Sequence, residues 1–316
     1  MWRATCVLVV VCCAAATTQS VSSQVKVTTT PKKLLCHYNL PCPGQRPPAP
    51  LPLSALDPSL CTHIIISSAV VHNTTIQPCT PGDTKVYKEV VSLKKQHPKL
   101  QVLVRVEGNW TTLIHDAQAV AVFAYNAGKF LRTLDLDGLE VAWQPPTWPP
   151  WESGTVQQVS LLLLQLNNAL QLASHPPFTL SMAVSASQNS IDHAYDITVI
   201  NRLLSSSWTK VGAPAVGLGL MEGRMTHPQV CTFVQKGSAW HWDKASRVPY
   251  AWRSRDWISY EDESSVKEKA QLVVTEDLAG VAVLDLNSDD WGGLCPRATT
   301  FPLLRAAKNV LSRSDS

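Results

Sequence analysis

The chain has 316 residues, of which 45% are hydrophobic and 16% are charged, and its formal net charge is +3 at pH 7. This length is sufficient for one large core, such as a single α/β barrel with an insertion. The net charge is too small to indicate nucleic acid or an anionic membrane surface as a partner.

The N-terminal residues have the pattern of a secretory signal peptide. Arg3 precedes an apolar run from Ala4 to Ala16, and the small polar segment Thr17–Ser20 follows. The apolar run is well short of a membrane span. We therefore predict a signal peptide at residues 1–20 and a secreted, extracellular protein with no membrane partner. A flexible lead-in is expected over residues 21–33, which are polar and rich in Ser and Thr.

Farther along, apolar segments of strand length alternate with longer segments of helical periodicity. This pattern is typical of repeated β-α units around a parallel sheet. Ile64–Ile66 and Val281–Leu284 are continuously apolar, as expected of parallel strands that are buried on both faces. The predicted strands are Leu34–Tyr38, His63–Ala69, Gln101–Val106, Gly138–Trp143, Thr179–Val184 and Gly280–Leu286. The predicted helices are Val86–Gln96, Ala117–Leu134 and Val156–Leu172.

The cysteine count fits an oxidising compartment. Of nine cysteines, Cys6, Cys12 and Cys13 leave with the signal peptide, and the remaining six allow up to three disulfides. The count alone leaves their connectivity open. The alternating Cys and His spacing of a zinc site is absent, so we predict no metal site and no cofactor.

Two sequons suggest a glycoprotein. They begin at Asn73 and Asn109, and each has Thr two positions later. Sequons also arise by chance, so both asparagines are candidates for glycosylation rather than established sites.

The segment Asp137–Pro146 reads Asp-Gly-Leu-Glu-Val-Ala-Trp-Gln-Pro-Pro. It resembles the Asp-Gly-x-Asp-x-Asp-x-Glu signature of family 18 glycoside hydrolases, the chitinases and chitinase-like lectins. The matching residues are Asp137, Gly138, Leu139, Trp143 and Pro146. Three positions depart from the signature: Glu140 replaces the second Asp, Ala142 the third Asp, and Gln144 the Glu.

The resemblance implies a lost activity. Family 18 enzymes hydrolyse β-1,4-linked N-acetylglucosamine with assistance from the substrate, an exception to the two-carboxylate scheme. The final Glu protonates the leaving oxygen, and the preceding Asp holds the acetamido group. Gln144 has no titratable proton to donate, and Ala142 has no group to hold the acetamide. Glu140 lies earlier on the strand and does not replace them. We therefore predict a pseudo-enzyme in which Asp137, Glu140, Ala142 and Gln144 form a degenerate, non-catalytic motif.

The resemblance covers almost the whole chain after the signal peptide. It includes Lys33–Cys36, Leu60–Ile65, Val104–Trp110, Ser190–Ile197, Val211–Pro214, Val248–Tyr250, Trp257–Asp262 and Gly280–Asp290. It implies one barrel domain over residues 34–312, with the remnant of a small α+β insertion at about residues 211–262.

One part of the family pattern is missing after Leu204, where Ser205–Trp208 leads straight into Val211–Pro214. The gap corresponds to strands six and seven, or about 60–80 residues at roughly 30 or more per βα unit. A barrel without two strands has two open edges. The predicted fold is therefore an α/β, TIM (β/α)8-type barrel that is incomplete. A shortened gene, a transcript lacking exons and an error in the gene model would each explain the gap.

The resemblance also implies disulfide pairs. Cys36–Cys61 would tie the first two strands together, and Cys231–Cys295 would tie the insertion to the loop after the last strand. Cys42 and Cys79 remain and could form a third pair.

Binding without hydrolysis depends on aromatic rings, because sugar rings stack on aromatic planes. The family Trp after the first strand is lost, the Trp after strand three is displaced by one place, and Leu284 stands where strand eight normally has Trp. The remaining candidates for carbohydrate binding are Tyr38, Trp110, Trp143 and Gln144.

The main prediction is a secreted, catalytically inactive chitinase-like glycoprotein that binds chitin or chito-oligosaccharide weakly, or a protein partner. One alternative is a chito-oligosaccharide-binding lectin that uses Trp110, Trp143 and Gln144. Another is a non-functional, truncated product whose open barrel is degraded. An active hydrolase ranks last.

Overall fold

The computed structural model describes residues 7–11, 31–40, 42–43, 51–108, 110–143, 155–185, 195–196, 199, 207–210, 225–253, 256–297 and 299–313. The strands are β1 (Val7–Val11), β2 (Lys33–Asn39), β3 (His63–His72), β4 (Thr75–Pro78), β5 (Gln101–Gly108), β6 (Gly138–Val141), β7 (Thr179–Ser185), β8 (Ser207–Lys210), β9 (Ala239–Asp243), β10 (Val248–Arg253), β11 (Asp256–Ser259) and β12 (Gly280–Leu284). The α-helices are α1 (Asp83–Ser92), α2 (Trp110–Ile114), α3 (Ala117–Leu134), α4 (Thr155–Ala173), α7 (His227–Gln235), α8 (Glu263–Thr275) and α9 (Pro302–Leu311). Short 3-10 helices are η1 (Leu53–Ala55), η2 (Pro58–Leu60), η3 (Leu93–Lys95) and η4 (Leu286–Ser288).

The large sheet has the parallel order expected of an α/β barrel. Its strands follow the order β1-β12-β2-β3-β5-β6-β7-β8, and β4 pairs with β3 as a side branch. From β12 through to β8, each strand is parallel to its neighbour. The predicted α/β class and parallel sheet are therefore confirmed.

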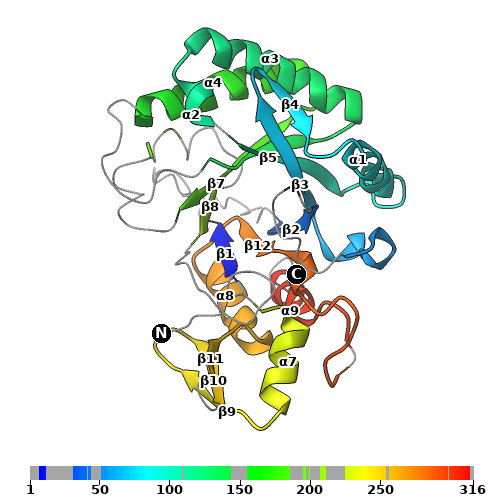
Figure 1. Ribbon diagram of the computed structural model, residues 1–316, viewed down its shortest axis with the longest axis vertical. Helices are drawn as coiled ribbons and strands as arrows, with labels where there is room; N and C mark the ends of the chain where they lie inside the picture. Colours follow the sequence, from blue (N-terminus) through cyan, green and yellow to red (C-terminus); the bar gives the residue numbers. More distant parts are fainter. Residues whose placement is uncertain are drawn as a thin grey trace, which may run out of the picture.

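Three strands of this sheet were not predicted: β1, β4 and β8. Strand β4 pairs antiparallel with the end of β3. Ser207–Lys210 forms β8, which extends the parallel sheet next to β7. Val7–Val11, within the predicted signal peptide, forms β1, which pairs antiparallel with β12. Because β1 also contacts β8, it lies between the two ends of the parallel sheet (Figure 1).

Each strand of the parallel sheet has an outer and an inner face. On the outer face, Ile64, Ile66 and Val104 pack in one cluster with Phe123 and Leu131 of α3. On the inner face, a smaller separate cluster contains Leu35, Ile65, Leu103 and Ala282. Side chains alternate between the two faces of a strand, so a residue two positions before or after a member of this inner cluster also faces the barrel interior.

Helix α3 shows how the outer layer is fixed locally. The Asp116 carboxylate caps its N-terminus by accepting hydrogen bonds from Gln118 N and Ala119 N, at 2.9 and 3.1 Å. The helix ends at Asp135, which adopts a left-handed conformation with φ of 55°. Its apolar side packs against the sheet and α4.

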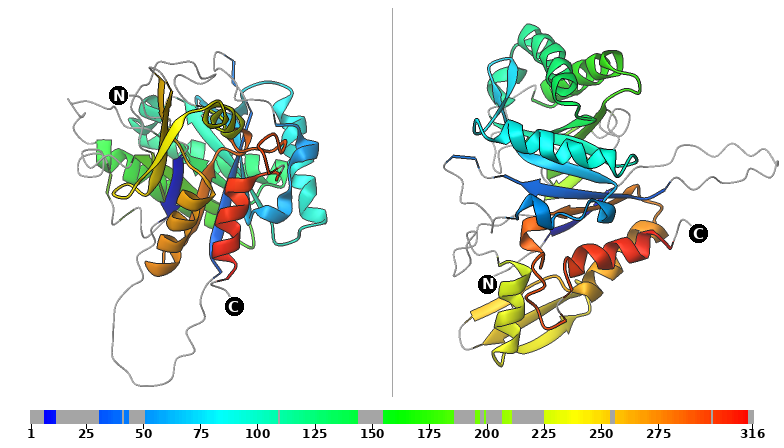
Figure 2. Two further views of the ribbon diagram at one scale, coloured as in Figure 1. Left: turned by 90° about the horizontal axis from the view of Figure 1, so that it is seen from below. Right: turned by 90° about the vertical axis from the view of Figure 1, so that its right-hand side faces the viewer.

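Helix α7 and strands β9–β11 form a second, smaller unit. Strands β9, β10 and β11 make an antiparallel sheet with order β11-β10-β9. Val230 and Phe233 of α7 pack against Ala251 and Ile258 of this sheet. The unit lies beside α8 and α9, at the opposite end of the molecule from α3 and α4 (Figures 1 and 2).

Candidate functional site

The signature strand β6 is anchored at its entry by Asp137 and Gly138. The Asp137 carboxylate accepts a hydrogen bond from Val102 N at 2.7 Å and another from Lys94 Nζ at 3.1 Å. A Cβ atom at Gly138 would collide with the Thr179 carbonyl of β7, so the position requires glycine. These two matches to the family signature therefore serve the packing of the strands.

Inside the barrel, Glu140 is the central member of a charged network. Its side chain is 0% exposed, and its Oε1 accepts a hydrogen bond from Arg105 Nη1 at 2.8 Å. Arg105 Nε donates a second bond, also 2.8 Å long, to Glu107 Oε1. His37 Nε2 lies 3.6 Å from Glu140 Oε2. Because the Glu107 side chain is 35% exposed, the network leads from the buried carboxylate to the end of β5.

Burial sets the protonation states of this network. It raises the pKa of Glu140 from 4.5 to about 7, although the Arg105 charge opposes the shift. It lowers the pKa of His37 well below 6.5, and the Arg105 charge acts in the same direction, so His37 is neutral at pH 7. Burial also acts to lower the pKa of Arg105, but the charges of Glu140 and Glu107 outweigh it and raise that pKa.

Glu140 is therefore enclosed and already bound. It has no exposed surface, and one of its oxygens is held by a cation from the neighbouring strand. Ala142, which follows β6 and is 8% exposed, has only a methyl side chain and carries no acidic group. Gln144 lies outside the described residues.

Arg105 was missed by sequence reasoning. It interrupts the otherwise apolar run Val102–Val106 of a predicted buried strand. A buried charge requires a partner, so the pattern Arg105-x-Glu107 on one strand face was an available signal. The pairing with Glu140 needed the register of β5 and β6, in which Arg105 lies opposite Glu140.

The three aromatic candidates for sugar binding that the structure describes are all buried. Tyr38 is 4% exposed, and its hydroxyl donates a hydrogen bond to Leu51 O at 3.0 Å. Trp110 is 1% exposed and packs edge-on against Phe123, with ring centroids 5.5 Å apart. Trp143 is 3% exposed and makes a similar edge contact with Tyr195. In this structure none of the three presents an open ring face on which a sugar could stack.

The end of β12 is organised by polar side chains. Leu284 is followed by Asp285, whose carboxylate accepts hydrogen bonds from Asn39 Nδ2 and from Ser288 N. Asn39 N donates to Asn287 Oδ1 at 3.1 Å. This network fixes β12 against β2 without an aromatic ring.

The structure contains the three disulfides that the sequence suggested, namely Cys36–Cys61, Cys42–Cys79 and Cys231–Cys295. Cys36 and Cys61 are buried between β2 and the start of β3. The other two bridges are partly exposed. His227 lies close to Cys231 and Cys295, a group that sequence spacing did not reveal.

The two sequons differ in what the structure describes. Asn73 is exposed in the turn between β3 and β4, with φ of 52°, a conformation that Asn tolerates. Asn109 lies outside the described residues, between Gly108 at the end of β5 and Trp110 at the start of α2. Among the described residues, no helix has the length and apolar character needed to cross a membrane.

Comparisons with known proteins agree with this architecture. The chain is 25% identical over 367 residues to oviduct-specific glycoprotein of Sus scrofa, covering 90% of this chain and 69% of that protein. It is 23% identical over 366 residues to chitinase-3-like protein 2 of Homo sapiens, covering 88% and 92%.

Solved structures show the same fold. Human YKL-39, described as a pseudo-chitinase with retained chitooligosaccharide binding, superposes with a TM-score of 0.76 at 19% identity, covering 89% of this chain and 100% of that one. Catalytic domain 2 of the Ostrinia furnacalis Group II chitinase superposes with a TM-score of 0.75 at 22% identity, covering 89% and 97%.

The family model of the glycosyl hydrolases family 18 matches the chain twice, over residues 43–213 and 205–289. Together the two matches take in most of the chain, including β6 and the Arg105, Glu107 and Glu140 members of the charged network. The chain belongs to glycosyl hydrolase family 18.

Proposed function

We propose that this protein is a secreted family 18 member without hydrolytic activity, which acts by binding carbohydrate or protein. The observation that carries the proposal is the state of the signature strand. Ala142 stands at the position of the acetamide-holding Asp, and Glu140, the one carboxylate left at the three altered positions, is buried and bound to Arg105. General acid catalysis typically contributes about 10²–10⁴-fold, and Gln144 cannot supply it.

Weak chito-oligosaccharide binding is the favoured carbohydrate activity. Its support is the likeness to YKL-39, which retains such binding. The burial of Tyr38, Trp110 and Trp143 argues against strong stacking, so Trp110 and Trp143 are poor anchors for a dedicated lectin. A protein partner remains part of the proposal and has no site assigned.

We also propose that the barrel is shortened. The two matches to the family model overlap only at residues 205–213, the place where the sequence pattern breaks. The alignment with the Sus scrofa protein extends over 367 residues, and it covers 90% of this chain, which is about 284 of its 316 residues. The relative therefore carries about 80 residues that have no counterpart here. This agrees with a loss of roughly 60–80 residues, or about two βα units.

The proposed domain division follows from these points. Residues 1–20 are a signal peptide, residues 21–33 a lead-in, and residues 34–312 the barrel domain, with the insertion remnant at about 211–262. The three disulfides and the likeness to a glycoprotein support secretion.

The test is to express the chain in a secretory host and assay the purified protein with chito-oligosaccharides. We expect no hydrolysis, and a weak, saturable change in tryptophan fluorescence as ligand is added. Turnover that survives repurification would overturn the assignment of inactivity. Tight binding would favour the lectin, whereas intracellular degradation with no secreted protein would favour the non-functional product.

A further inference from the structure

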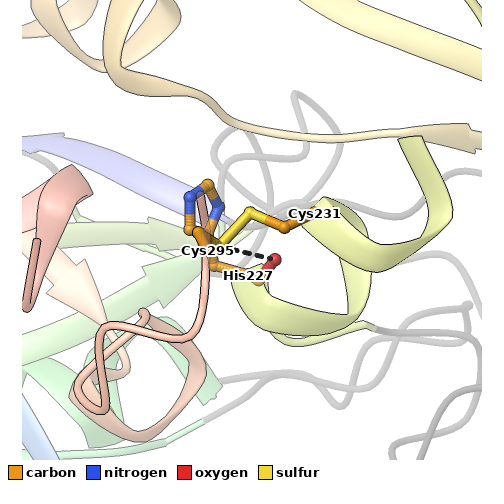
Figure 3. Close-up of side chains that lie close together, drawn as sticks. All are labelled: His227, Cys231 and Cys295. Carbon is orange, nitrogen blue, oxygen red and sulfur yellow. Dashed lines mark hydrogen bonds between the residues drawn. A yellow bond between two sulfur atoms is a disulfide. The ribbon is translucent and has the colours of Figure 1, made fainter. Parts of the chain in front are cut away.

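A histidine and the Cys231–Cys295 disulfide form a compact group away from the signature strand. His227 is the first residue of α7, and Cys231 follows one helical turn later on the same side. Cys295 approaches from the loop between η4 and α9. One nitrogen of His227 and the two sulfur atoms all lie within 4.8 Å of one another (Figure 3).

The backbone that carries these three residues is held by contacts independent of the disulfide. At the start of α7, Gln229 Oε1 accepts a hydrogen bond from Thr226 N at 2.8 Å. On the opposing loop, the carboxylate of Asp290, which is 0% exposed, accepts hydrogen bonds from Leu294 N and Cys295 N, both at 2.8 Å. Breaking the S–S bond therefore leaves both cysteines fixed near their present positions.

The group is also accessible. It opens into a cavity of about 200 Å³, whose lining includes Glu263 and Arg297 as well as the three residues themselves. All three are partly exposed, whereas Cys36 and Cys61 are buried. A small dithiol can therefore reach the Cys231–Cys295 bond without unfolding the barrel.

We propose that reduction of Cys231–Cys295 converts this group into a zinc site with His227, Cys231 and Cys295 as ligands. A dithiol reduces the bond: the protein S–S bond breaks, the reagent is oxidised to its own disulfide, and two protein thiols form. Zinc then binds both sulfur atoms as thiolates and releases two protons. His227 contributes the lone pair of one ring nitrogen in its neutral form.

The distances suit this chemistry. Zinc binds sulfur at about 2.3 Å and imidazole nitrogen at about 2.0–2.1 Å in a tetrahedral arrangement. The two sulfur atoms would then lie about 3.7 Å apart, which rotation of the two Cys side chains can reach from a Cα–Cα separation of 5.8 Å. The cavity leaves the fourth position open to water. The oxidised protein has no thiolate ligands here and should not bind zinc.

The test uses Co²⁺ as a coloured substitute for zinc. The secreted protein is reduced with a dithiol, freed of reagent under anaerobic conditions, and titrated with Co²⁺. We expect the charge-transfer and visible bands of a tetrahedral thiolate site at one equivalent, and their loss when Zn²⁺ is added. His227→Ala, which leaves the disulfide pair intact, should weaken Co²⁺ binding by at least about tenfold, since even outer-shell partners of a metal contribute about 10–100-fold.

Controls separate this site from the other thiols. Cys231→Ser should abolish the bands, whereas a Cys42→Ser/Cys79→Ser variant and His241→Ala should keep them. Near-ultraviolet circular dichroism monitors the fold during reduction. The proposal is overturned if the reduced protein loses its tertiary structure, if the bands persist in Cys231→Ser, or if His227→Ala binds Co²⁺ as well as the parent.

Discussion

Arg105 Nη1 lies 2.8 Å from Glu140 Oε1, between neighbouring strands inside the barrel. The only carboxylate left at the three altered signature positions is thus neutralised by a cation of the same chain. A substrate would have to break a buried ion pair to use it.

This ion pair leads to a prediction on stability. Arg105→Ala leaves Glu140 buried without its partner, and breaking a buried pair typically costs about 3–5 kcal/mol. We expect a loss of that order in the free energy of unfolding, measured by denaturant titration. Arg105→Met combined with Glu140→Gln removes both charges and should cost less than Arg105→Ala alone. A loss below about 1 kcal/mol in Arg105→Ala would show that the pair does not support the fold.

The second prediction concerns attempts to restore hydrolysis. Gln144→Glu returns a proton donor but not the group that holds the acetamide, so this variant should stay inactive towards chito-oligosaccharides. Gln144→Glu combined with Ala142→Asp returns both groups, and any activity that can be rescued should appear only in this double variant. Both variants are assayed beside the parent after identical purification. Turnover by Gln144→Glu alone would contradict the role assigned to Ala142.

The third prediction concerns acid stability. Burial lowers the pKa of His63 from 6.5 to about 4, so the folded protein holds this ring neutral while the unfolded chain protonates it. The free energy of unfolding should therefore fall as pH drops from 6.5 to 4, by roughly 3 kcal/mol from this residue. His63→Gln should lose less stability over this range, and exposed His72→Gln should behave like the parent. The raised pKa of Glu140 makes the free energy of unfolding change in the opposite direction between pH 4.5 and 7. This contribution is the same in the parent and in His63→Gln, so it cancels when the two are compared.

Equal slopes of stability against pH in the parent and in His63→Gln would contradict this assignment. Thr62 Oγ1 lies 2.7 Å from His63 Nδ1. Glutamine is chosen because it can keep a hydrogen bond at that position.

The fourth prediction is that Asn73 carries a glycan when the chain is made in a secretory host. Its side chain is exposed at a turn, and Thr75 completes the sequon. Enzymatic deglycosylation followed by mass spectrometry should convert Asn73 to Asp in the relevant peptide. Asn73→Gln provides the matched control, and an unmodified Asn73 peptide from the secreted protein would be the contrary result.

The fifth prediction is that Asn109 is also glycosylated and that its glycan obstructs the barrel opening. Gly108 ends β5 immediately before it, at the C-terminal rim where sites of this fold class form. Mass spectrometry of the Asn109 peptide tests occupancy. Asn109→Gln should then bind chito-oligosaccharide better than the parent. If the fully occupied parent binds with the same stoichiometry as Asn109→Gln, the obstruction is disproved.

Local patterns predicted the elements well where one face of the element is strongly apolar. Helix α3 runs from Ala117 to Leu134 as predicted. The predicted helix Val86–Gln96 instead begins at Asp83, whose carboxylate accepts hydrogen bonds from the Thr80 backbone and hydroxyl, and its last turn narrows into η3. Periodicity detects the buried face of a helix but not the polar contacts that set its ends.

Two predicted strands ended earlier than expected. The last strand stops at Leu284 rather than Leu286, because the Asp285 carboxylate binds Ser288 N and starts η4. Strand β6 stops at Val141, where its register with Met182 of β7 ends. The site was harder to predict than these elements, because the Arg105–Glu140 pair depends on contacts between residues distant in sequence.

The place of β1 connects the order of synthesis with the shape of the sheet. Val7 pairs with Leu284 and Val11 with Gly280, so the earliest part of the chain to be made contacts almost the latest. A leader removed during translocation is gone before β12 emerges, and the hydrogen-bonding edge of β12 is then left for another strand or for solvent. A protein that keeps its leader can complete the sheet within one chain. The N-terminal residue of the secreted protein therefore shows whether its large sheet contains β1 or lacks it.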